Sequence, residues 1–282
     1  MKYLIARILF LIFIFNTTIS SSQEVATDSL KSDTSVHQVF AGFSFSNYPL
    51  YYQANFAGMN SAFSTHLLYS FNTNLWFEAK FYHLPNKSPF FSLHELAAGY
   101  NHYFNHIFDA GIVVSRLKNH QNHDDNAFDH YTMVNAQIGI DWGYLYTTIV
   151  PSYIWQDFGS FFMVINNSRF FVSPKFGKNQ NFITANPGFY FLLGRETWFR
   201  ELPLEFQQRL IRRGLEHLIP TLSIVEKPFR FQTLTFTLPL ALEMMPVSIE
   251  LEPSFVINLN TNAIVRQPEG FFVRVGLFYN IL

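Results

Sequence analysis

The segment that decides the fold is Phe271 to Leu282, FFVRVGLFYNIL, in which apolar side chains alternate with a mixed set. The side chains of successive residues in a β-strand point to opposite faces. The period of two therefore predicts a strand with one wholly apolar face. The other face is mixed and includes Arg274, Gly276 and Asn280. The apolar face consists of Phe271, Val273, Val275, Leu277, Tyr279 and Ile281.

The same segment resembles the C-terminal insertion signal of bacterial outer-membrane β-barrel proteins. In that signal a polar or charged residue precedes a glycine by two positions, and hydrophobic residues follow three and five positions after the glycine. Arg274, Gly276, Tyr279 and Ile281 fit this order, and Leu282 follows where the family usually ends on an aromatic residue. The resemblance implies a bacterial outer-membrane location, contact with the bilayer and lipopolysaccharide, and handling by the outer-membrane insertion machinery.

The composition agrees with a large apolar surface. Aromatic residues make up 18% of the 282 residues, with 34 Phe, and charged residues only 14%, against about 25% in soluble proteins. The sequence has no Cys, which excludes disulfides, thiolate metal sites, Cys nucleophiles and a lipoprotein anchor.

The first residues have the pattern of a secretory signal peptide. Lys2 and Arg7 precede the apolar run Ile8 to Phe15, and Ser22 offers a small residue for cleavage. We expect a signal peptide over residues 1–22, a flexible periplasmic lead-in over 23–35 and a transmembrane β-barrel over 36–282. An uncleaved anchor is the alternative. Removal of residues 1–22 leaves 17 Lys and Arg against 20 Asp and Glu, a net charge of −3, which argues against a nucleic-acid partner.

The remaining sequence has no apolar window of about 20 residues that would span a bilayer as a helix. A closed barrel is the other structure that satisfies its backbone within lipid. We therefore predict an all-β fold, an antiparallel transmembrane β-barrel of about 12 strands, with ten or fourteen strands as alternatives. The expected strands cover about 36–45, 62–71, 75–82, 94–104, 107–116, 131–142, 145–155, 161–176, 182–193, 231–242, 247–258 and 271–282.

The connections between these strands alternate in length, as they do in barrels with short periplasmic turns and long extracellular loops. One short helix is expected over Glu201 to Leu218, within the longest extracellular loop. Its Arg209, Arg212 and Arg213 could meet lipopolysaccharide phosphates or a partner, or the helix could simply pack on its own barrel. A secreted β-sandwich is the competing fold, but its outward face would be mostly polar.

The predicted period places the ionisable side chains of the strands on the inward face. They could line a polar channel for small solutes, or they could fill a narrow, closed barrel with ion pairs; twelve strands lie between the filled and the open cases. These candidate lumen residues are Glu78, Lys80, Glu95, Asp109, Asp141, Glu250, Glu252 and Arg274.

Two further clusters carry chemistry. The loop Asn119 to His130 contains His120, His123, Asp125 and His130, which could hold a divalent metal, although the spacing fits no zinc motif and a solvated loop is the simpler interpretation. Ser64 and His66 are two residues apart on one strand face. They resemble the Ser and His of outer-membrane lipid hydrolases, but outer-membrane phospholipase A has the order His-x-Ser, so two polar lumen residues without a catalytic role are favoured.

The sequence therefore leaves three functions open, in this order. The first is a small channel with a polar lumen. The second is a non-conducting structural or accessory barrel that docks a protein partner through its extracellular loops. The third is a lipid-modifying enzyme. No cofactor and no catalytic residue are predicted.

Overall fold

The fold was described from a computed structural model of the chain. The structure describes residues 36–47, 50–51, 54–55, 61–72, 74–85, 88–120, 130–155, 160–194, 197–199, 224–226, 229–260 and 269–281. The predicted signal peptide, the lead-in and the helix at Glu201 to Leu218 lie outside these residues. Within them, no helix is long and apolar enough to cross a membrane.

The described residues form β-strands joined by turns and loops. The strands of the main sheet are β1 (His37–Ser46), β4 (Ala62–Phe71), β5 (Leu75–His83), β6 (Leu93–Tyr103), β7 (Phe108–Asn119), β8 (His130–Asp141), β9 (Tyr146–Trp155), β10 (Ser160–Ser168), β11 (Phe171–Val172), β12 (Phe182–Ala185), β13 (Gly188–Gly194), β16 (Arg230–Thr237), β17 (Leu240–Met244), β18 (Val247–Asn258) and β19 (Gly270–Asn280). Two separate ribbons pair β2 (Leu50–Tyr51) with β3 (Ala54–Asn55), and β14 (Thr197–Phe199) with β15 (Ile224–Glu226).

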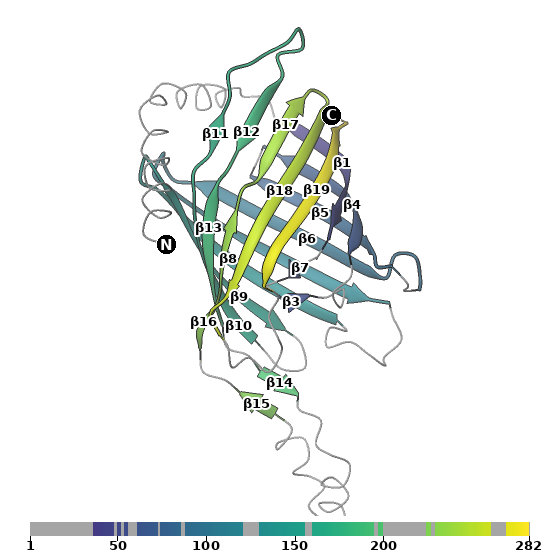
Figure 1. Cartoon of the computed structure of the whole chain (residues 1–282), viewed down its shortest axis with the longest axis vertical. Helices are drawn as coiled ribbons and strands as arrows, with labels where there is room; N and C mark the ends of the chain where they lie inside the picture. The colour runs from purple at the N-terminus through teal and green to yellow at the C-terminus, as the bar shows by residue number, and fades with distance from the viewer. Residues whose placement is uncertain are drawn as a thin grey trace, which may run out of the picture. The chain divides into compact units, whose positions relative to one another are not determined.

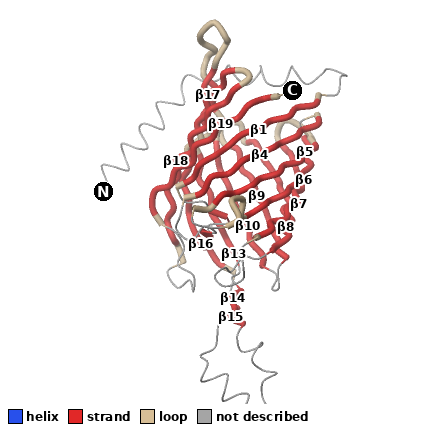
Figure 2. The backbone as a smooth tube through the Cα atoms, turned by 90° about the vertical axis from the view of Figure 1, so that its right-hand side faces the viewer, coloured by secondary structure: helices blue, strands red, loops and turns tan. Residues whose placement is uncertain are grey.

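The main sheet closes on itself as an antiparallel barrel (Figure 1). Each strand pairs with its neighbours along the chain, and β1 also pairs with β19, with Phe43 opposite Leu277. β11, β12 and β17 continue β10, β13 and β16, so the wall has twelve strands, which run obliquely side by side in Figure 2. The predicted antiparallel barrel of about 12 strands is confirmed, and the predicted strands at 62–71 and 247–258 coincide with β4 and β18.

Large apolar side chains are exposed on the outward face of the barrel. Phe43, Leu67, Phe77, Ile138 and Leu277 are 44% to 61% exposed. Aromatic side chains are exposed near both barrel ends, for example Tyr103 and Trp142 at one end and Trp155 and Phe271 at the other. This arrangement fits a lipid-facing band bounded by aromatic girdles.

The connections differ in length between the two ends. At one end are the turns over 72–74, 104–107, 142–145 and 245–246, together with the start of β1 and the end of β19. A hairpin that turns between Phe176 and Asn181 also lies at this end. The connections at the other end are mostly longer. The predicted alternation is present, and we call the two ends the short-turn end and the long-loop end.

Prolines lie where the ladders between strands are interrupted. Pro187 and Pro239 fall in the breaks between β12 and β13 and between β16 and β17, and Pro253 faces the second break from β18. The carbonyl oxygens of all three accept hydrogen bonds from Arg169, Asn186 and Leu238. A proline has no N–H to donate to a ladder, which explains the interruptions. Pro151 and Pro253 lie inside strands β9 and β18.

The inner wall at the long-loop end contains a buried apolar cluster. A cluster of seven side chains lies there on the face opposite the exposed residues, and Tyr82 and Phe162 pack against it. Directly paired members, such as Leu117 with Tyr131 and Met133 with Ile154, cover one another. The cluster consists of Ala62, Leu84, Leu93, Leu117, Tyr131, Met133 and Ile154.

The alternation of faces predicts opposite effects for two neighbouring substitutions. Leu67 is 50% exposed on the outward face of β4, whereas Leu68 pairs with Glu78 on the inner wall. Leu67→Arg should lower the free energy of unfolding in lipid vesicles by about 2–4 kcal/mol, the cost of a basic residue near the bilayer midplane. Leu68→Arg should lower the free energy of unfolding by a smaller amount, because the new guanidinium lies opposite the carboxylate of Glu78. Denaturant titration measures both, and an equal or larger loss for Leu68→Arg would contradict the assignment of faces.

Candidate functional site

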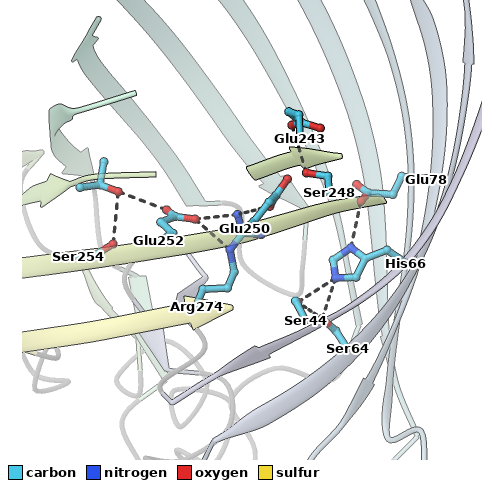
Figure 3. A network of polar contacts seen from close by, with 11 residues as sticks. Ser44, Ser64, His66, Glu78, Glu243, Ser248, Glu250, Glu252, Ser254 and Arg274 are labelled. Carbon is cyan, nitrogen blue, oxygen red and sulfur yellow. Dashed lines mark hydrogen bonds and ion pairs between the residues drawn. The ribbon is translucent and has the colours of Figure 1, made fainter. Parts of the chain in front are cut away.

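The candidate site lies on the inner wall where the first and last strands of the barrel meet. Because β1 pairs with both β4 and β19, side chains from the two ends of the chain become neighbours. Phe278 of β19 lies over Gly42 of β1, where a Cβ atom would overlap the phenyl ring. Its ring also meets the imidazole of His66 edge-on, with centroids 5.6 Å apart. Figure 3 shows the polar side chains around this position.

Five side chains of β1, β4 and β5 form a linked chain of polar contacts. His66 Nε2 lies 2.8 Å from Ser64 Oγ and 3.0 Å from Ser44 Oγ, and the two hydroxyl oxygens are 2.6 Å apart. His66 Nδ1 lies 3.4 Å from Glu78 Oε1, and Lys80 Nζ lies 2.8 Å from Glu78 Oε2. The Ser64 and His66 pair is therefore not isolated, because the inner wall supplies it with a second hydroxyl and a carboxylate.

A second group surrounds Arg274 of β19. Its guanidinium donates to Glu252 Oε2 through Nε at 2.9 Å and Nη2 at 2.7 Å, and Nη2 lies 3.8 Å from Glu250. Glu252 also accepts a 3.4 Å hydrogen bond from Thr237. On β17, Glu243 accepts a 3.1 Å hydrogen bond from Ser248. These residues come from neighbouring strands on the other side of the β1–β19 seam, as Figure 3 shows.

The charged side chains of this wall are partly exposed. The side chains of Glu78, Glu250, Glu252 and Arg274 retain between 19% and 43% of their exposure, although they point to the inside of the barrel. The apolar cluster at the long-loop end is at most 8% exposed. The interior therefore combines partly exposed charged side chains with a buried apolar cluster near one end.

The other predicted lumen residues lie on separate parts of the inner wall. Glu95 is buried and accepts a 2.8 Å hydrogen bond from Tyr82. Asp109 accepts one of 2.7 Å from Tyr146. Asp141 lies 3.8 Å from Arg169. The structure brings together Glu78, Lys80, Glu250, Glu252 and Arg274 at the seam, and it leaves these three carboxylates with local partners.

Sequence reasoning missed Ser44, Glu243 and Arg169. Ser44 was overlooked because its importance comes from lying opposite Ser64, 20 residues away, in the β1–β4 ladder. In β17, Glu243 alternates with the apolar residues Leu240 and Leu242. Its inward position could therefore have been predicted from the period of two. Arg169 stands between β10 and β11, at a break that periodicity does not show.

Of the predicted metal ligands, only His120 and His130 lie among the described residues. His120 Nε2 lies 3.1 Å from His94 Nδ1, a partner on a neighbouring strand that the sequence did not indicate. His123 and Asp125 lie outside the described residues, and His130 begins β8. Among the side chains that the structure describes, no group of three or more His, Asp or Glu could hold a metal ion. Metal binding by this loop stays a prediction.

Arg274, Gly276 and Tyr279 of the predicted insertion signal lie in β19, and Ile281 follows the last residue of that strand. Tyr279 and Ile281 are half exposed on the outward face, whereas Arg274 and Gly276 face inward. Their part in insertion stays a prediction.

The exposure of the Arg274 pair predicts weak coupling between its members. A cycle of Arg274→Gln, Glu252→Gln and the double variant should give a coupling free energy of about 1 kcal/mol or less, as for solvated ion pairs. Arg274 and Glu243, for which the structure gives no ion pair, are the matched control pair. Their coupling free energy should be smaller. A loss of about 3–5 kcal/mol for a single variant, typical of a buried ion pair, would indicate a dry, filled barrel instead.

Three solved structures share the general architecture at low similarity. A KdgM porin matches with a TM-score of 0.46 and 9% identity, covering 86% of this chain and 98% of its own. A KdgM porin in complex with disordered oligogalacturonate matches with a TM-score of 0.44 and 9% identity, covering 86% of this chain and 98% of its own. The translocator domain of autotransporter NalP from Neisseria meningitidis matches with a TM-score of 0.39 and 12% identity, covering 91% of this chain and 92% of its own. No protein-family model and no curated protein sequence matches the chain.

Proposed function

We propose that the protein is a channel of the bacterial outer membrane that lets small solutes pass through a polar lumen. The observation that carries the proposal is the contrast between the two faces of the closed wall. Large apolar side chains such as Phe43 and Leu67 are exposed outside. Charged side chains inside, such as Glu250 and Arg274, keep contact with water. A wall with these two faces suits a bilayer around it and an aqueous path within it.

The charges at the seam favour cations over anions. Four carboxylates, those of Glu78, Glu243, Glu250 and Glu252, lie on this part of the wall with two basic side chains, Lys80 and Arg274. Four negative and two positive charges leave an excess of two negative charges when His66 is neutral. Carboxylates on a pore wall select cations, so we expect neutral and cationic solutes to pass more readily than anions.

The apolar cluster near the long-loop end would form the narrow part of the path. Its side chains are buried against one another, and an apolar constriction limits conduction because it sheds water. Tyr131 and Met133 contribute the largest of these side chains from a single strand.

Current through planar bilayers tests the channel and its selectivity. The folded protein should give discrete current steps and a reversal potential that favours the cation in a salt gradient. Glu243→Gln combined with Glu250→Gln should move the cation-to-anion permeability ratio toward one. Glu95→Gln is the control, because it removes one charge of the same kind from a buried carboxylate bonded to Tyr82.

Silence from protein with a verified folded, heat-modifiable band would contradict the channel. In that case the non-conducting accessory barrel becomes the better account. Anion preference in the unaltered protein would contradict the role given to the seam carboxylates.

If the apolar cluster is the narrow part of the path, its side-chain volume should limit the unitary conductance. Tyr131→Ala and Met133→Ala should raise the unitary conductance, because each removes side-chain volume from the buried cluster. Ile138→Ala, on the outward face of the same strand, removes a similar apolar side chain that is 51% exposed and should leave conductance unchanged. Conductance that is unaffected by the two inward variants would place the narrowest point elsewhere.

A further inference from the structure

We propose that Ser64 is the nucleophile of an acyl-transfer site on the inner wall, with His66 as its general base and Glu78 as the positioning residue. The substrate class is a small ester that enters the lumen. This activity goes beyond solute passage and rests on the proposed function only in requiring that small molecules reach the seam.

The argument starts from the distances around the imidazole of His66. Nε2 lies 2.8 Å from Ser64 Oγ, and Nδ1 on the opposite side of the ring lies 3.4 Å from Glu78 Oε1. A nucleophile, a base within hydrogen-bond reach and a third group that orients the base are the three parts of nucleophilic catalysis by serine. The Nδ1 contact is long, but such contacts tighten when substrate binds.

The backbone holds these three parts in fixed register. Ser64 and His66 are two residues apart on β4 and therefore point to the same face. β4 is paired with β1 from Ala62 to Phe71 and with β5 from Phe63 to Phe71. Lys80 stands directly opposite His66 and binds the second oxygen of Glu78 at 2.8 Å, which fixes the carboxylate that faces the imidazole. A site built on paired strands is positioned more firmly than one built on loops.

Ser44 supplies a further hydroxyl beside the nucleophile. It is directly opposite Ser64 in the ladder, and its Oγ lies 2.6 Å from Ser64 Oγ. When Ser64 donates its proton to His66, the Ser44 hydroxyl is the neighbouring donor that can reach the oxygen of a bound acyl group. Its role is to donate to the negative charge that develops on that oxygen.

The chemical step balances with water as the only co-reactant. Ser64 Oγ bonds to the carbonyl carbon while its proton passes to His66 Nε2, and the ester C–O bond breaks as that proton passes to the leaving alkoxide. Water then attacks the acyl group under the same base, releases the carboxylic acid and returns the proton to Ser64.

The surroundings of the three residues indicate what the ester can be. Phe278 lies edge-on to His66 and offers an apolar contact for a short acyl chain. The excess of carboxylates on the wall disfavours an anionic molecule. The Ser64 side chain is buried, so we expect a compact acyl group and a neutral or cationic leaving alcohol.

Covalent labelling tests the proposal on the folded, full-length protein. A small alkyl fluorophosphonate is incubated with the protein in detergent, and peptide mass spectrometry locates the adduct. We expect the adduct on Ser64. His66→Gln should slow its formation by about a hundredfold or more, the usual range for a general base. Ser70→Ala, on the same face of β4, is the matched control and should label at the unaltered rate.

The Glu78 variants separate positioning from general structural damage. Glu78→Gln should slow labelling, and Glu78→Asp should restore part of the rate, because only a carboxylate can orient the imidazole. No adduct, an adduct on Ser44 in place of Ser64, or an unchanged rate in His66→Gln would overturn the assignment. The unaltered protein carries the primary result, so a variant that fails to fold does not decide the outcome.

The result is independent of conduction. Protein that conducts but does not label would overturn this inference alone, and protein that labels but does not conduct would overturn the channel alone.

Discussion

The structure depends on the pairing of β1 with β19, because this ladder turns an open sheet into a closed wall. A backbone N–H or C=O group without a partner in lipid costs several kcal/mol. The register from Phe40 opposite Asn280 to Ser46 opposite Arg274 gives the two terminal strands their partners. The C-terminal segment is therefore the last strand of the barrel. Its apolar residues face outward because the neighbouring strands hold it on both sides.

Closure also creates the chemistry inside. It brings Arg274 and Phe278, near the end of the sequence, beside His66 and Ser44, near its beginning. Alternation then sends the charged side chains of several strands to one interior, where they are partly exposed at the seam and separate from a buried apolar cluster around Tyr131. One constraint thus produces the apolar outer surface, the polar inner wall and the buried cluster together.

Much of this could be predicted from sequence, because a period of two fixes both the strand and its faces. The inward positions of Glu78 and Glu252 follow from that period alone. Partners across the wall could not be predicted, because they depend on register between strands. Ser44 opposite Ser64 and His94 beside His120 arise from cross-strand pairing, and the breaks at Pro187 and Pro239 arise from neighbouring ladders. The predicted helix over Glu201 to Leu218 lies outside the described residues and stays a prediction.

The central claim, a closed wall with lipid outside and water inside, is tested most directly by cysteine scanning of β18. The chain contains no Cys, so each single variant from Ser248 to Ser254 reports on one position. In lipid vesicles, a membrane-impermeant thiol reagent should react with cysteines at 248, 250, 252 and 254 and spare those at 249 and 251. Reaction at all positions alike, or only at 249 and 251, would contradict the account.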